Sequence, residues 1–305
     1  MNWIIYAIIP AFLWAIVNHI DKYLIEKYYK GIRVGSLVIF SSLIGLPVSI
    51  LIYLFNQSVF EIPIQQILLI VFAGISYIIG VVFYLYALSK DEASTIVPNM
   101  MLVPSIGAIL SYFFLGESLS HLQVFAIFLV IFGALLISSD LKDLRFPKLK
   151  PDVFLLMVCF AFFMSLNAII FKYAMIVEYD FWVIAFWEHI GFLALGIFCL
   201  AFINTYRVQF WNLVKKNSFG IISLNTLNES ITISGNLIFH YAIFLAPVAI
   251  VESLTEGVQP VFVLAIAIFL TLFFPKLGKE ELTKKILIQK FFAIIIMFIG
   301  IHLLD

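Results

Sequence analysis

The chain has 305 residues, of which 64% are hydrophobic and only 12% are charged, and its formal net charge is zero. A soluble domain is about half apolar and about a quarter charged, so this composition excludes an ordinary soluble protein and indicates a multi-pass membrane protein. Because the charges balance, no strongly basic surface is available for nucleic acid. We therefore expect a lipid bilayer around the chain and no nucleic-acid partner.

Ten apolar segments follow one another along the chain, and each approaches the roughly 20 residues that a helix needs to cross a bilayer. Turn-forming or charged clusters separate them. The first apolar run continues to Ile20 without a small-residue cleavage site, so we expect it to remain as a helix rather than act as a cleaved signal peptide. The predicted helices are 3–21, 34–55, 65–88, 93–115, 121–139, 152–174, 182–204, 218–245, 248–274 and 284–304.

Lysine and arginine gather on one side of the predicted membrane protein. The loops after the odd-numbered helices, with the helix ends beside them, hold every Lys and Arg except Lys172. Loops rich in these residues stay in the cytoplasm. The chain is therefore expected to place both termini outside, and we expect the cytoplasmic membrane of a bacterium or archaeon.

The two halves of the chain resemble each other. Ala11-Phe12 followed by Lys22-Tyr23 recurs, at one constant offset, as Ala161-Phe162 followed by Lys172-Tyr173. Five helices per repeat is an odd number, so the second copy has to be inverted, and inverted repeats are the architecture of alternating-access carriers. The predicted domains are a first repeat at 1–139, a basic cytoplasmic linker at 140–151 and a second repeat at 152–305.

The predicted helix 218–245 carries the most polar stripe of the chain. Its side chains at helical spacing are Asn225, Glu229, Thr232, Asn236 and His240. Such residues inside a bilayer face a protein interior or a water-filled cavity. We expect this stripe, with Asn228 beside it, to form one wall of a substrate pathway; a buried polar seam that joins helices is the alternative.

Further acidic groups lie in two neighbouring helices. Glu252 and Glu256 are one helical turn apart and are expected to bind a proton or a cation, unless Glu252 is simply solvated near the membrane surface. Glu188 and His189 are candidates for substrate binding and for proton coupling, respectively. Adjacent helical residues point about 100° apart, so these two do not form a pair by themselves.

The other candidates for the cavity wall come from the first half. They are Trp14, Asn18, Tyr84 and Asn99. Lys172 lies against the charge bias, so it either reaches the membrane surface or pairs with a carboxylate. The two cysteines lie in separate apolar runs and indicate packing rather than a disulfide or metal site.

Short motifs in the first half resemble those of the drug/metabolite transporter superfamily, in its ten-helix type with two EamA domains. The motifs are Phe12-Leu13-Trp14-Ala15 with Asn18 and Lys22, Tyr84-Leu85-Tyr86-Ala87-Leu88, Pro104, and Phe114-Leu115-Gly116-Glu117-Ser118-Leu119. The second half departs from the pattern at 273–280. The resemblance implies an all-α membrane fold and a transport role, and says little about the substrate. We explain Glu117 as a carboxylate at a helix start rather than as a substrate residue.

These observations predict a secondary or facilitative transporter that exports a small polar or amphipathic metabolite, such as an amino acid, by alternating access. No Walker A loop, His-x-x-x-His pair or Gly-x-Ser-x-Gly elbow is present in the sequence, so we expect no enzyme activity, metal or cofactor. A membrane-embedded enzyme acting on a lipid headgroup is the alternative, and a non-transporting receptor or assembly protein is a second. We also expect proton coupling through Glu229, Glu252, Glu256 or His189. The protein is expected to be a monomer or a homodimer.

Overall fold

A computed structural model gives the fold of the chain and describes residues 2–27, 34–90, 97–138, 150–216, 219–274 and 284–304. Every regular element in these ranges is a helix. The long helices are α1 (Asn2–Lys27), α4 (Ile64–Lys90), α8 (Pro151–Ile176), α9 (Phe181–Phe202), α11 (Phe219–Leu245), α12 (Val248–Phe273) and α13 (Lys284–Leu304). The shorter elements are α2 (Val34–Leu43), α3 (Gly45–Phe55), α6 (Leu102–Leu115), α7 (His121–Ser138), α10 (Asn204–Lys216) and the 3₁₀ turns η1 (Gln57–Phe60) and η2 (Val97–Met101).

The structure confirms an all-helical membrane protein and refines the predicted helices. The segment predicted at 34–55 is interrupted at Ile44, which separates α2 from α3. The segment predicted from residue 93 begins with η2 among its described residues, next to Pro98. The expected linker at 140–151 lies outside the described residues except for its last two.

One predicted loop is a helix instead. Residues 204–216 form α10, whose Phe210 and Leu213 are buried while Val208 and Trp211 are about half exposed. Leu213 packs against Leu24 of α1. The apolar residues at 208, 210–211 and 213–214 were the signal for an amphipathic helix, and the surrounding lysines obscured it.

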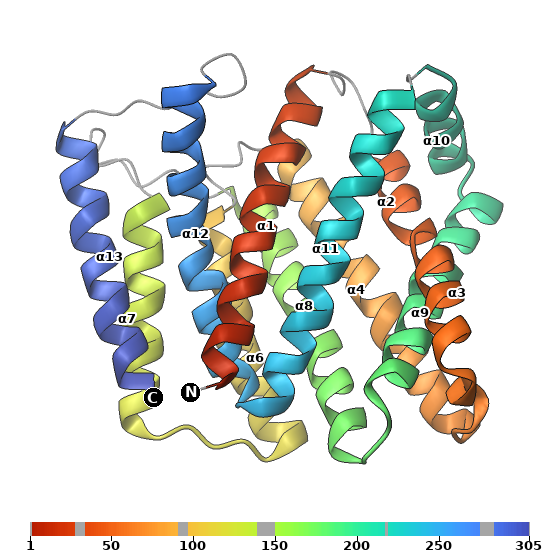
Figure 1. Cartoon of the computed structure of the whole chain (residues 1–305), viewed down its shortest axis with the longest axis horizontal. Helices are drawn as coiled ribbons and strands as arrows, with labels where there is room; N and C mark the ends of the chain where they lie inside the picture. The colour runs from red at the N-terminus through yellow and green to blue at the C-terminus, as the bar shows by residue number, and fades with distance from the viewer. Residues whose placement is uncertain are drawn as a thin grey trace.

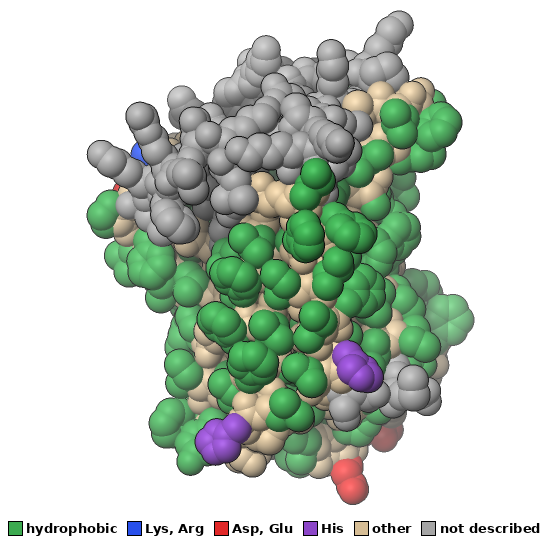
Figure 2. All heavy atoms as spheres, turned by 90° about the vertical axis from the view of Figure 1, so that its left-hand side faces the viewer, with side chains coloured by type: hydrophobic (Ala, Val, Ile, Leu, Met, Phe, Trp, Pro, Cys, Tyr) green, Lys and Arg blue, Asp and Glu red, His purple; other side chains and the backbone are tan. Residues whose placement is uncertain are grey.

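Several helices match the dimensions of a bilayer. Within the described part of the chain, six segments are long and apolar enough to cross a membrane: Trp3–Asp21, Val34–Phe55, Ile64–Ala87, Pro151–Ile176, Phe181–Phe202 and Val248–Phe273. Large apolar side chains also cover the outside, such as Phe128 of α7 and Phe298 of α13, which are 59% and 64% exposed. Figure 2 shows the face over α7 and α13 as almost wholly hydrophobic where it is described. The chain is therefore an integral, multi-pass membrane protein.

The helices run side by side, and both chain ends lie at the same edge of the molecule (Figure 1). Most of the close packing joins the first half of the chain to the second. Helix α1 packs on α11 and α12, and α4 packs on α8 and α9. Helix α6 packs on α8 and α12, α2 and α3 pack on α9, and α7 packs on α13.

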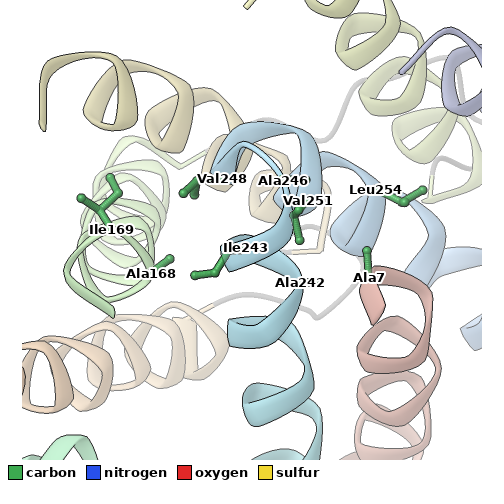
Figure 3. Close-up of a cluster of buried hydrophobic side chains, with 9 residues drawn as sticks. All are labelled: Ala7, Ala168, Ile169, Ala242, Ile243, Ala246, Val248, Val251 and Leu254. Atoms are coloured by element: carbon green, nitrogen blue, oxygen red, sulfur yellow. The ribbon is translucent and has the colours of Figure 1, made fainter. Parts of the chain in front are cut away.

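The largest buried cluster among the described residues lies around the break between α11 and α12 (Figure 3). Pro247 directly precedes α12. The clustered side chains are Ala7, Ala168, Ile169, Ala242, Ile243, Ala246, Val248, Val251 and Leu254. Because four of the nine are alanines, the helices approach closely here, as is typical of membrane proteins.

Gly74 of α4 and Gly191 of α9 mark a close approach between the backbones of the two halves. A Cβ atom on Gly74 would overlap the carbonyl oxygen of Glu188, which belongs to the backbone of α9. We expect Gly74→Val to lower the free energy of unfolding by about 1–3 kcal/mol, measured by denaturant titration in detergent. Gly80→Val is the control, because its nearest neighbour is the flexible side chain of Met164. Equal losses in both variants would contradict the close packing of α4 on α9.

Candidate functional site

A cavity of about 260 Å³ lies between the two halves of the chain. Ligand pockets for small molecules have volumes of about 300–1,000 Å³, so this cavity suits a small metabolite. Its polar lining residues are Asn18, Asp21, Ser41, Asn167, Asn225, Asn228, Glu229, Thr232, Asn236, His240, Glu252, Glu256 and Gln259. Its aromatic lining residues are Trp14, Tyr77, Tyr84, Phe160, Phe192 and Phe239.

The charge of this lining is entirely acidic. Asp21, Glu229, Glu252 and Glu256 each contribute a carboxyl group, and no Lys or Arg is found among the described residues that line the cavity. The four groups come from three helices: α1, α11 and α12. Clefts lined by one sign of charge attract ligands of the opposite sign.

Helix α11 presents its polar stripe to the cavity. All five residues from Asn225 to His240 at the helical spacing line it, so the wall lies where the spacing predicts it. Glu229 Oε1 accepts a hydrogen bond of 2.5 Å from the Ser41 hydroxyl of α2. Asn228 Nδ2 donates to Asp21 Oδ1 at 2.7 Å, which ties α11 to α1.

Three buried polar atoms of cavity-lining residues have no partner among the described residues. Asn228 Oδ1, His240 Nδ1 and Glu252 Oε2 are buried without a hydrogen bond. Glu252 is only 1% exposed, and a Cβ atom on Gly107 of α6 would overlap its carboxylate. A buried polar atom without a partner is costly, so each of these atoms lowers the stability of the fold. Glu252 is thus buried against α6, and the alternative of a solvated residue at the membrane surface is wrong.

Asp21 and Gln259 line the cavity and were not among the sequence candidates. Asp21 was overlooked because it stands beside Lys22 at the end of an apolar run, where charged residues commonly mark the membrane surface. Its spacing from Trp14 and Asn18 places all three on one helical face. Gln259 follows Glu256 by three residues, so helical spacing places both side chains on one face of α12.

Three sequence candidates lie away from the cavity surface. Asn99 is buried in η2, and its neighbour Met100 lines the cavity instead. Glu188 and His189 are both 1% exposed and lie behind the wall. His189 Nδ1 lies 2.7 Å from the carbonyl oxygen of Ala185 in its own helix, so its ring is directed along α9.

Lys172 pairs with a carboxylate rather than reaching the membrane surface. Its ammonium group forms an ion pair with Glu117 and donates to the carbonyl oxygen of Ala246 at 2.7 Å. The backbone N–H of Val248 donates to Glu117 Oε2 at 2.9 Å. Glu117 therefore caps the start of α12 and not that of its own next helix α7, a contact between distant segments that sequence spacing does not reveal. The side chain of Lys22 lies outside the described residues.

The comparisons with known proteins agree on the class of protein. The EamA-like transporter family matches residues 1–139. An uncharacterized transporter of Clostridium kluyveri is 28% identical over 141 residues, which are 46% of this chain and 44% of that protein. The chain thus matches less than half of that relative's length.

A second relative and a solved structure are also similar to the chain. An uncharacterized protein of Methanocaldococcus jannaschii is 29% identical over 97 residues, which are 32% of this chain and 71% of that protein. A solved crystal structure, described only as that of a protein, superposes with a TM-score of 0.70 at 14% identity, over 99% of this chain and 95% of the other. At that identity the superposition shows a shared fold and nothing about activity.

Proposed function

Residues 1–139 match the EamA-like transporter family, and from this premise we propose that the chain is a secondary or facilitative transporter of the drug/metabolite type. The cavity between the halves is its substrate site. The proposed substrate-binding residues are Trp14, Asn18, Tyr84, Asn225, Asn228, Glu229, Asn236 and Glu256, all of which line the cavity.

The helix packing supports ten membrane-crossing helices in two inverted repeats. In this scheme α1 corresponds to α8, α4 to α11 and α6 to α12. The contacts of α1 with α11 and α12 then have counterparts in those of α8 with α4 and α6. The pairs α7 with α13 and α6 with α12 map onto themselves. In this scheme the cavity lies at the repeat interface, where carriers bind their substrates.

The acidic lining supports an amine-bearing substrate. Four carboxyl groups without a Lys or Arg among the described lining residues favour a cation, and this observation carries the proposal. Trp14 and Tyr84 add aromatic surfaces, which attract ammonium groups. The amides of Asn225, Asn228 and Asn236 supply hydrogen bonds that orient polar groups. An amino acid would also need a cationic partner for its carboxylate, and the described lining residues provide none.

Transport by alternating access requires the cavity to open to either side in turn. We assign Glu229 and Glu256 to both substrate binding and proton coupling. A carboxyl group that releases its proton when it binds an ammonium group links substrate transport to proton transport. Both chain ends share one edge (Figure 1), which supports an even number of crossings. The distribution of Lys and Arg in the sequence supports both termini outside. We further propose that the protein resides in the cytoplasmic membrane, is a monomer or a homodimer, and exports its substrate.

The test is uptake by proteoliposomes from a pooled metabolite mixture, with and without a pH gradient, read by mass spectrometry. We expect protein-dependent accumulation of amine-bearing compounds, and gradient dependence would support proton coupling. Accumulation of carboxylate compounds alone would contradict the assigned substrate class. Modified lipid headgroups without any accumulation would favour a membrane-embedded enzyme instead.

A further inference from the structure

Behind the cavity wall, four helices meet at a second group of buried polar side chains. Glu188 of α9, Asn167 of α8 and His240 of α11 are at most 3% exposed. Asn167 Nδ2 donates to Glu188 Oε1 at 2.7 Å and to the carbonyl oxygen of Ala73 in α4 at 3.1 Å. Asn167 and His240 also line the cavity, whereas Glu188 does not.

The hydrogen bonds of Asn167 fix the tautomer of His240. The carbonyl oxygen of Ala73 can only accept, so the Asn167 atom facing it is the amide nitrogen. The amide oxygen therefore faces His240 Nε2 at 3.2 Å, and Nε2 has to donate. In the neutral ring, Nδ1 then carries a lone pair. It has no hydrogen-bond partner among the described residues and lies 3.6 Å from Glu188 Oε2.

The surroundings favour a site for one proton. The pair of Glu188 and His240 has no net charge when it holds one proton, either on Glu188 Oε2 or on His240 Nδ1, and a charge of −1 without it. A net charge in a buried apolar site is costly. Phe171 of α8 stacks on the His240 ring at 3.8 Å between centroids, which covers one face of the ring with an apolar group.

The other titratable groups that face this site are few. His189 of α9 and Tyr77 of α4 lie near it, and the facing residues of α8, Asn167 and Phe171, do not titrate. His189 Nδ1 faces the carbonyl oxygen of Ala185, so Nδ1 donates and the ring is neutral without a further proton. The histidine in contact with Glu188 is His240, whose Nδ1 lies 3.6 Å from Glu188 Oε2.

We propose that Glu188 and His240, held in register by Asn167, form a binding site for one exchangeable proton that is separate from the substrate-binding carboxylates. The proton moves between Glu188 Oε2 and His240 Nδ1 and exchanges with the cavity through the His240 ring. His240 lines the cavity, so the site communicates with whichever side of the membrane the cavity faces. This deepens the proposed transport function, on which its role in coupling rests.

The first test needs no substrate. The full chain in lipid vesicles is studied by pH-dependent infrared difference spectroscopy, which detects the C=O band of a protonated carboxyl group. We expect a buried-acid band that disappears in Glu188→Gln, shifts in His240→Phe, and is unchanged in Glu61→Gln, whose side chain is exposed. If Glu188→Gln leaves every carboxyl band in place while the protein stays folded, the proton site is refuted.

The second test separates proton coupling from transport itself. Vesicles are assayed with labelled tyramine, once for exchange against internal tyramine without a pH gradient and once for accumulation driven by a gradient. Glu188→Gln is expected to keep exchange within about twofold of the wild type and to lose gradient-driven accumulation. Loss of both activities equally would overturn the coupling role. If the wild type transports nothing while its infrared band behaves as expected, the transport proposal fails and the proton site stands.

Discussion

Replacing Glu229 with Gln is expected to reduce the affinity for an amine substrate by roughly 30-fold or more. Removing one partner of a hydrogen-bonded charge pair in a buried site costs about 2–5 kcal/mol, and each 1.4 kcal/mol is about tenfold in affinity. The carboxamide keeps the size of the side chain and can still accept from the Ser41 hydroxyl. The loss therefore reports the missing charge, and it is measured as the concentration dependence of tyramine uptake into proteoliposomes.

Ser230→Ala is the matched control for this variant. Ser230 is adjacent to Glu229 in α11 and is exposed, and its hydroxyl donates to the carbonyl oxygen of Thr226 in its own helix. We expect its uptake to equal that of the wild type. If Ser230→Ala loses as much uptake as Glu229→Gln, the effect comes from α11 as a whole. If Glu229→Gln transports normally, Glu229 is not a substrate ligand.

Replacing Lys172 with Met is expected to lower the free energy of unfolding by about 3–5 kcal/mol, because it leaves a largely buried carboxylate without its cation. The side chains of Lys172 and Glu117 are only 8% and 14% exposed. The pair joins α8 and the turn before α7 to the break between α11 and α12. Denaturant titration in mixed micelles measures the loss.

Lys90→Met is the control, because Lys90 forms an exposed ion pair with Asp152, with side chains 47% and 55% exposed. Exposed pairs contribute at most about 1 kcal/mol. The double variant Lys172→Met with Glu117→Gln is expected to recover part of the lost stability, since no unpaired charge is left. If the double variant loses the sum of the two single losses, the two residues are not coupled.

The fold was predictable because each helix carries its own signal. Apolar runs such as 65–88 and 152–174 are long and bounded by charges, and α4 and α8 follow them closely. The sequence does not predict helix α10, because polar and basic residues stand between its apolar ones. Its helical structure depends instead on packing, such as that of Leu213 on Leu24. Local pattern fails where tertiary contacts supply the stability.

The candidate site was predictable only within single helices. The spacing of the α11 stripe places its residues on one face, and that face lines the cavity. The partners across helices were not predictable, because a contact such as Glu188 with His240 depends on how distant segments pack. Lys172 with Glu117 is a further example. In the sequence, Glu188 stands beside His189 and Glu117 stands at the start of a helix. In the fold, each of these carboxyl groups contacts a residue of a distant segment instead.

The most direct test of the central claim compares three compounds that share a hydroxyphenyl ring and a short arm but differ in charge. Tyramine carries an ammonium group, tyrosol a neutral hydroxyl and phloretate a carboxylate. Each is applied to proteoliposomes on a solid-supported membrane, and the transported amount is verified by mass spectrometry. The acidic cavity predicts protein-dependent uptake of tyramine, with a transient current, and little uptake of the other two. Equal uptake of all three, or a preference for phloretate, would contradict an amine carrier.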